Sequence, residues 1–150
     1  MDVHTPETRS KNMAAIRSKD TKPEIWLRKK LHALGYRYRL NDKKLPGKPD
    51  IVLKKYNAVI FVHGCFWHMH DCPMFKLPKS RTEWWEAKLS ANKERDRKQV
   101  FQLQKLDWRV LIVWECAIKG RMKLDEGELI KEVIEWFGSD AGFAELCGAE

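Results

Sequence analysis

The spacing of hydrophobic residues along the chain predicts three helices. A segment that begins at a capping Thr21 and ends at Gly35 places three leucines on one helical face. A longer, mostly polar pattern predicts a second helix over residues 82–106. Residues 126–137 carry an apolar stripe, which predicts an amphipathic helix with one face in the core.

Four other segments have the composition of β-strands. Residues 36–40 alternate in polarity, and residues 50–56 and 58–64 are joined at Asn57, which predicts a hairpin. Residues 108–115 are apolar throughout their middle, as expected of a central buried strand.

The predicted order is helix, three strands, helix, strand and helix. This order favours an α/β fold in which helices flank a mixed sheet. A chain of 150 residues fits one compact domain, and we expect residues 1–150 to form it. Within it, we interpret residues 1–20 as a basic N-terminal arm and residues 138–150 as a tail for which no element is predicted.

The net charge of +8 is concentrated in the first two thirds of the chain. Basic residues outnumber acidic ones by 13 to 6 in residues 1–50 and by 10 to 5 in residues 51–100, whereas residues 101–150 carry 6 basic and 10 acidic ones. Such a field favours a polyanion, because neutralising phosphates releases condensed counterions. Nucleic acid is therefore a candidate partner, although a solvated basic surface would have the same composition.

Hydropathy and leader patterns argue against a membrane or secreted protein. No apolar run reaches the roughly 18 residues of a membrane span. The N-terminal residues lack the apolar stretch of a secretory signal. We expect a cytoplasmic protein with no membrane partner, whose thiols are reduced.

Cysteine and histidine residues cluster in the middle of the chain. Cys65, His68, His70 and Cys72 fall within eight residues, and Cys116 follows the strand predicted at 108–115. Thiolates and imidazoles at this density suit tetrahedral Zn²⁺. We interpret Cys65, His70, Cys72 and Cys116 as a structural zinc site; His68 in place of His70, or buried thiols beside surface histidines, are the alternatives.

Acidic residues near the predicted hairpin suggest a second metal site. Asp50 opens a strand after a turn, where its carboxylate could bind Mg²⁺. In many nucleases the next strand supplies a second carboxylate and a lysine, but here Phe61 and His63 occupy those places. The carbonyl oxygen of Val62 could replace the missing carboxylate. Glu24 could add a carboxylate from the first predicted helix, although it equally fits a capping box at the start of that helix.

Five segments together resemble the very-short-patch-repair endonucleases. They are TRSKNM (8–13), LPGKPD (45–50), IFVHGCFWH (60–68), NKERDR (92–97) and WRVLIVWEC (108–116), and the similarity extends to about Phe137. The resemblance implies a restriction-endonuclease-like core with a structural zinc site. It also implies Mg²⁺-dependent nicking of the T-bearing strand at T·G mismatches, which arise when 5-methylcytosine deaminates.

The same resemblance implies a role for individual residues. Asp50 and the Val62 carbonyl would bind Mg²⁺, and His68 would be the general base. The supporting residues would be Glu24, His63 and Asp96; the zinc ligands would be Cys65, His70, Cys72 and Cys116. Phe66, Trp67 and Trp85 would enter the duplex beside the mismatch, although the sequence by itself does not choose between Trp84 and Trp85.

Several expectations about partners accompany this interpretation. Arg9, Lys11, Arg17 and Lys19 in the arm could grip phosphates. We expect a monomer that works at the nucleoid and contacts mismatch-repair proteins. The alternatives are a restriction-type nuclease with another DNA target and a zinc-containing DNA-binding module without catalysis.

Overall fold

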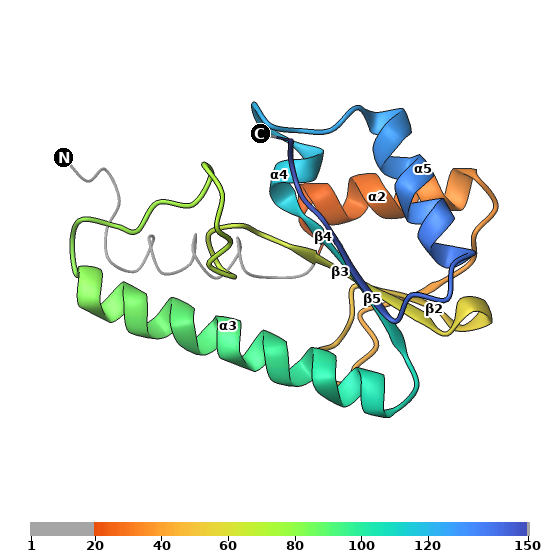
Figure 1. Ribbon diagram of the computed structural model, residues 1–150, viewed down its shortest axis with the longest axis horizontal. Helices are drawn as coiled ribbons and strands as arrows, with labels where there is room; N and C mark the ends of the chain where they lie inside the picture. The colour runs from red at the N-terminus through yellow and green to blue at the C-terminus, as the bar shows by residue number, and fades with distance from the viewer. Residues whose placement is uncertain (1–19, 150) are drawn as a thin grey trace.

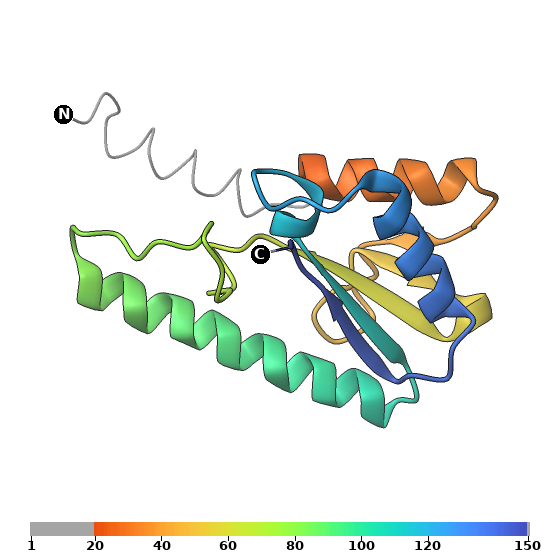
Figure 2. The ribbon, with the colours of Figure 1, turned by 45° about the horizontal axis from the view of Figure 1, so that its top comes forward.

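The computed structural model describes residues 20–149, which form a five-stranded sheet with helices on both faces (Figures 1 and 2). In chain order the elements are α2 (Lys22–Ala33), β1 (Arg39–Leu40), β2 (Ile51–Leu53), the 3-10 turn η1 (Lys54–Tyr56), β3 (Ala58–His63), α3 (Thr82–Lys105), β4 (Arg109–Trp114), α4 (Glu115–Ile118), α5 (Glu126–Phe137) and β5 (Phe143–Leu146). The four basic residues predicted to grip phosphates from the arm lie outside the described residues.

The strands lie in the order β1-β2-β3-β4-β5, and their directions are mixed. β1, β2 and β3 pair antiparallel, whereas β3, β4 and β5 pair parallel. The hairpin predicted at Asn57 is confirmed: η1 turns the chain, and Asn57 ends it in the left-handed conformation with φ 50° and ψ 40°. A parallel pair needs a long crossover, which α3 supplies between β3 and β4.

The sheet buries both of its faces, so β3 is buried at every position. On one face it packs against α2 and α5, and on the other against α3 (Figure 2). The first core cluster includes Leu27, Leu31, Ile60, Leu111, Leu129 and Val133, and the second includes Val59, Phe61, Leu103, Val110 and Ile112. No helix among residues 20–149 is long and apolar enough to cross a membrane.

Three predicted boundaries are wrong. The strand predicted at 36–40 is only Arg39–Leu40, because Tyr36 packs on Phe137 of α5, with ring centroids 5.1 Å apart. The strand predicted at 50–56 ends at Leu53, where η1 begins the hairpin turn. The tail contains β5, which pairs with β4 at the edge of the sheet.

Candidate active site and metal centre

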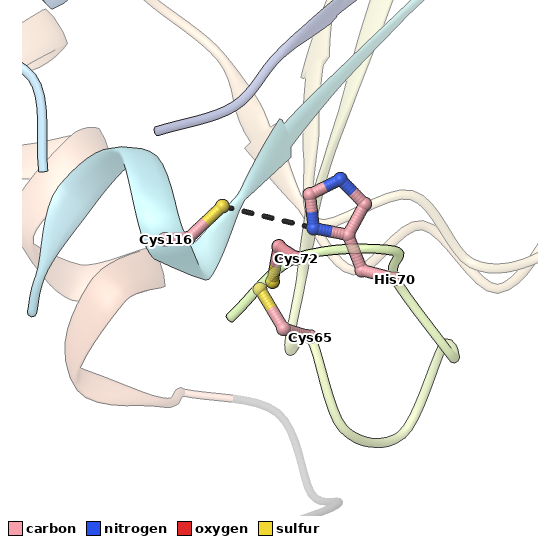
Figure 3. A group of neighbouring side chains, drawn as sticks. All are labelled: Cys65, His70, Cys72 and Cys116. Carbon is pink, nitrogen blue, oxygen red and sulfur yellow. Dashed lines mark hydrogen bonds between the residues drawn. The ribbon is translucent and has the colours of Figure 1, made fainter. Parts of the chain in front are cut away.

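Three cysteines and one histidine converge where β3 and β4 end. One ligand atom from each of Cys65, His70, Cys72 and Cys116 lies within 4.8 Å of the others (Figure 3). Nδ1 of His70 is 3.7 Å from Sγ of Cys116, although the two residues are far apart in sequence. All four cysteines of the chain lie within the described residues and are free thiols.

Local backbone contacts hold this cluster, which we call the metal centre. The amide of Cys65 donates to Oε1 of Glu115 (3.2 Å), and the amide of His70 donates to the carbonyl of Cys65 (2.9 Å). Met69 has φ 52°, so the loop turns sharply between His68 and His70. Burial raises the pKa of the Cys65 thiol far above its usual range. A bound cation would offset this effect, and the donor set fits a tetrahedral metal ion.

The six residues predicted to act in catalysis or magnesium binding line one cleft beside the metal centre. They are Glu24, Asp50, Val62, His63, His68 and Asp96. The arrangement predicted to matter most, a carboxylate at Asp50 and an imidazole at His68 on the same side of the molecule, is therefore present. The cleft extends to the aromatic residues Phe66 and Trp67.

Asp50 and Glu24 form a carboxyl pair inside this cleft. Oδ2 of Asp50 accepts a hydrogen bond from the amide of Val62 (2.6 Å). Burial raises the pKa of Asp50 well above its usual range, and the neighbouring Glu24 raises it further. Burial also raises the pKa of Glu24. Two buried oxygen-donor groups side by side suit a hard divalent cation, which would offset both effects.

His68 belongs to a second pair, which links the loop to α3. Its Nδ1 lies 2.5 Å from Oδ2 of Asp96, and its ring stacks on His63 with centroids 3.7 Å apart and planes at 3°. Burial lowers the pKa of His63 well below its usual range, with smaller contributions from His68 and His70. His63 is thus held as a neutral ring beside the more exposed His68.

Aromatic side chains form a connected group at one end of the cleft. Phe66 contacts Trp67 and Trp85 with centroid distances of 5.0 and 5.4 Å, and Trp67 lies 5.9 Å from Trp85. Trp85 is buried, whereas Trp84 is 45% exposed beneath the cationic group of Arg81. The wedge residues predicted from the resemblance are therefore neighbours.

Two residues at the site, Asn92 and Glu115, were missed by the sequence analysis. Buried Asn92 donates from Nδ2 to the carbonyl of Trp67 (3.2 Å) and so ties the loop to α3. Glu115 holds the amide of Cys65 and pairs with Lys119 (2.9 Å). Asn92 precedes Asp96 by four residues, a spacing that puts both on one helical face and could have indicated it. Nothing local in the sequence distinguishes Glu115.

Comparison with known proteins identifies the family. The model of the family described as DNA mismatch endonuclease Vsr matches residues 1–74. The DNA mismatch endonuclease Vsr of Escherichia coli is 49% identical over 145 residues, which cover 97% of this chain and 93% of that protein. The chain belongs to the Vsr family. The predicted resemblance is thus confirmed, and so is the prediction of a DNA endonuclease.

Other Vsr relatives are named as strand-nicking enzymes. A Type II nicking enzyme of Neisseria meningitidis serogroup A is 46% identical over 134 residues, covering 88% of this chain and 96% of that protein. A Type II nicking enzyme of Haemophilus parainfluenzae is 42% identical over 137 residues, covering 90% and 97%. Membership of the Vsr family implies an endonuclease fold, which the mixed sheet with its helices matches.

Proposed function

We propose that this Vsr-family enzyme nicks the T-bearing strand of double-stranded DNA at T·G mismatches by Mg²⁺-dependent hydrolysis. The observation that carries the proposal is the convergence of two pairs, Asp50 with Glu24 and His68 with Asp96, in one cleft. Hydrolysis of a phosphodiester needs a base for water and neutralisation of phosphate charge, and the two pairs divide these tasks.

The carboxyl pair is the proposed magnesium site. Asp50 would hold the ion together with the carbonyl oxygen of Val62, and Glu24 would add a carboxylate beside them. The Val62 amide already points at Asp50, and the N–H and C=O of one residue in an extended strand project from the same edge. When bound, Mg²⁺ neutralises charge on the phosphate and stabilises the leaving oxygen.

His68 is the proposed general base. Its Nδ1 faces Asp96, so the carboxylate favours the tautomer with a proton on Nδ1 and a lone pair on Nε2. Nε2 would take a proton from the attacking water. His63 would hold the His68 ring by stacking on it, since its own burial keeps it neutral.

Phe66, Trp67 and Trp85 are proposed to enter the duplex beside the mismatch. Inserting a ring between base pairs costs a few kcal/mol of stacking, and this cost is lowest at a weakly held pair such as T·G. Their mutual contacts would present them as one wedge. Arg9, Lys11, Arg17 and Lys19 would grip phosphates from the arm.

Zn²⁺ is proposed for the metal centre, where it would hold the wedge loop and His68 still. Three sulfurs and one nitrogen form a closed four-ligand set, which is typical of structural rather than catalytic zinc. We further propose that residues 1–150 act as one endonuclease domain, as a monomer at the nucleoid with contacts to mismatch-repair proteins.

The proposed activity is tested with matched duplexes. We expect nicking of the T strand in a T·G duplex with Mg²⁺, and little cleavage of the same duplex with T·A. Equal cleavage of both would favour the second candidate, a nicking enzyme with a different target, which the names of several relatives motivate. Intact DNA at high enzyme concentration would leave only a binding module.

Replacing Asp50 tests the magnesium site directly. We expect Asp50→Ala to abolish nicking while zinc content and thermal stability are retained, because the carboxyl group is buried with its pKa raised and contributes little to folding as an ion. Asp140→Ala removes an exposed carboxylate and serves as the control. Wild-type nicking by Asp50→Ala would contradict the assignment.

A further inference from the structure

We propose that the segment 143–149 belongs to the metal centre, where the backbone of Gly148 positions the sulfur of Cys116. This inference rests on the zinc site proposed above and assigns a role to a segment that supplies no ligand. In Figures 1 and 2 the chain that continues from β5 runs beside α4, the helix that carries Cys116.

The contact that carries the inference joins Gly148 to a metal ligand. The amide of Gly148 donates to Sγ of Cys116 at 3.2 Å. A backbone N–H aimed at the sulfur favours the thiolate, which is the form that binds metal. Cys65, His70 and Cys72 converge with Cys116, so the amide of Gly148 adds a hydrogen bond to one of four clustered ligands.

Only glycine fits this position. A Cβ at residue 148 would lie 2.6 Å from the carbonyl oxygen of Cys116 and 2.6 Å from that of Met122. Both atoms belong to the backbone, so neither can move aside cheaply. The close approach that puts the amide of Gly148 on the sulfur therefore requires the absence of a side chain.

Neighbouring contacts fix the segment in this place. β5 pairs parallel to β4, and the amide of Ala149 donates to the carbonyl of Met122 (2.8 Å). Glu145 accepts a hydrogen bond from Nε1 of Trp114 (3.4 Å), and the Trp114 ring stacks on the ligand His70 with centroids 4.0 Å apart and planes at 8°. The segment thus contacts one ligand residue, Cys116, directly and another, His70, through the Trp114 ring.

Zinc affinity of the full-length protein tests the inference. Loss of a hydrogen bond to a metal ligand typically weakens metal affinity by roughly 10–100-fold, and we expect an increase of this order in the zinc Kd of Gly148→Ala. The matched control is Gly142→Ala, because a Cβ there meets nothing within 4 Å. Competition with a chromophoric chelator measures the Kd of each protein.

A spectroscopic readout separates positioning from general destabilisation. In Co²⁺-substituted protein, the sulfur-to-metal charge-transfer band of Gly148→Ala should shift to lower energy, since a sulfur without its hydrogen bond is more electron-rich. Ala149→Pro removes the amide that anchors the segment from an exposed position, and its ring also restricts the backbone of Gly148. It should raise the zinc Kd less than Gly148→Ala does. If Gly148→Ala does not fold, the zinc Kd of Ala149→Pro tests the inference in its place.

The outcomes distinguish this inference from the zinc proposal itself. If wild-type protein binds no zinc, or Cys72→Ser binds it as tightly as wild type, both ideas fall. If Cys72→Ser loses zinc while Gly148→Ala and Ala149→Pro match Gly142→Ala in Kd and in the Co²⁺ spectrum, the role of Gly148 alone is overturned.

Discussion

At the scale of single residues, the proposed chemistry depends most on the contact between His68 and Asp96. Nδ1 of His68 and Oδ2 of Asp96 are 2.5 Å apart, and a carboxylate at this distance favours the tautomer with the proton on Nδ1. An imidazole held in the other tautomer would offer N–H instead of a lone pair at Nε2. In the proposed mechanism Asp96 would thus act through His68, as a positioning residue.

Substituting the amide for the carboxylate tests this role. We expect Asp96→Asn to lower kcat for nicking by roughly 10²–10⁴-fold with little change in KM, because the amide permits the wrong tautomer of His68. Glu94→Gln, an exposed substitution on the same helix, is the control. A kcat within twofold of wild type in Asp96→Asn would show that His68 needs no orientation.

The candidate metal ligands could be predicted from the sequence, but the residues that contact and support them could not. Cys65, His70 and Cys72 are conspicuous because soft ligands rarely occur so densely, and the structure brings them together with Cys116. The chain has eight glycines and seven tryptophans, and Gly148 and Trp114 differ from the others only through contacts between distant segments. Such contacts exist only once the sheet has formed.

Arg109 joins several elements at the opposite end of the sheet from the cleft. From the start of β4 its guanidinium donates to the carbonyls of Trp136 and Phe137, where α5 ends, and to that of Tyr56 in η1. It also lies over the Trp136 ring, 4.3 Å from the centroid. Arg109 therefore satisfies carbonyls that the last turn of α5 leaves open.

Loss of Arg109 should weaken the fold and leave the chemistry intact. We expect Arg109→Met to lower the free energy of unfolding by about 3 kcal/mol, since several hydrogen bonds from a charged group are lost together. Nicking well below the melting temperature should be unchanged. Arg97→Met, an exposed arginine of α3, is the control. Equal urea midpoints for both variants would contradict the proposed role.

Element prediction succeeded where the pattern is periodic and failed where pairing alone defines the element. α5 matches its apolar stripe, with Leu129, Val133 and Phe137 buried. β5 alternates between exposed and half-buried positions, but its residues, FAEL, do not alternate in polarity. It is a strand because β4 offers an edge to pair with, and residues 143–146 do not encode that edge locally.

At the scale of the whole molecule, the helices α5 and α3 differ in charge. α5 carries the exposed acids Glu126, Glu128, Glu132 and Glu135, whereas α3, on the opposite face of the sheet, carries exposed Lys93, Arg95, Arg97 and Lys98. The cleft is lined by residues of both α2 and α3, which contribute Lys22 and Arg95. We expect the DNA to lie along this cleft, where these cations would attract phosphates.

The salt dependence of DNA binding measures this asymmetry. In the background of Asp50→Ala, which keeps the DNA intact, we expect Arg95→Gln to reduce the slope of log K against log[salt] by about 0.9, the value for one lost phosphate contact. Lys131→Gln, an exposed cation on α5, should leave the slope unchanged. Fluorescence anisotropy at several salt concentrations provides both slopes, and equal slopes would place the DNA elsewhere.

The loop that carries Trp67 and His68 contacts α3 at two places that are far apart along the helix. Trp67 touches Trp85, and the next loop residue, His68, touches Asp96, so neighbours on the loop meet helix positions 11 residues apart. The number of residues between Trp85 and Asp96 in α3 therefore fixes how these two side chains are oriented relative to each other. One inserted residue would turn Asp96 by about 100° relative to Trp85, and seven would nearly restore the angle but move Asp96 about 10 Å along the helix axis. A change of length in this span should therefore break the contact with His68 or the contact with Trp67.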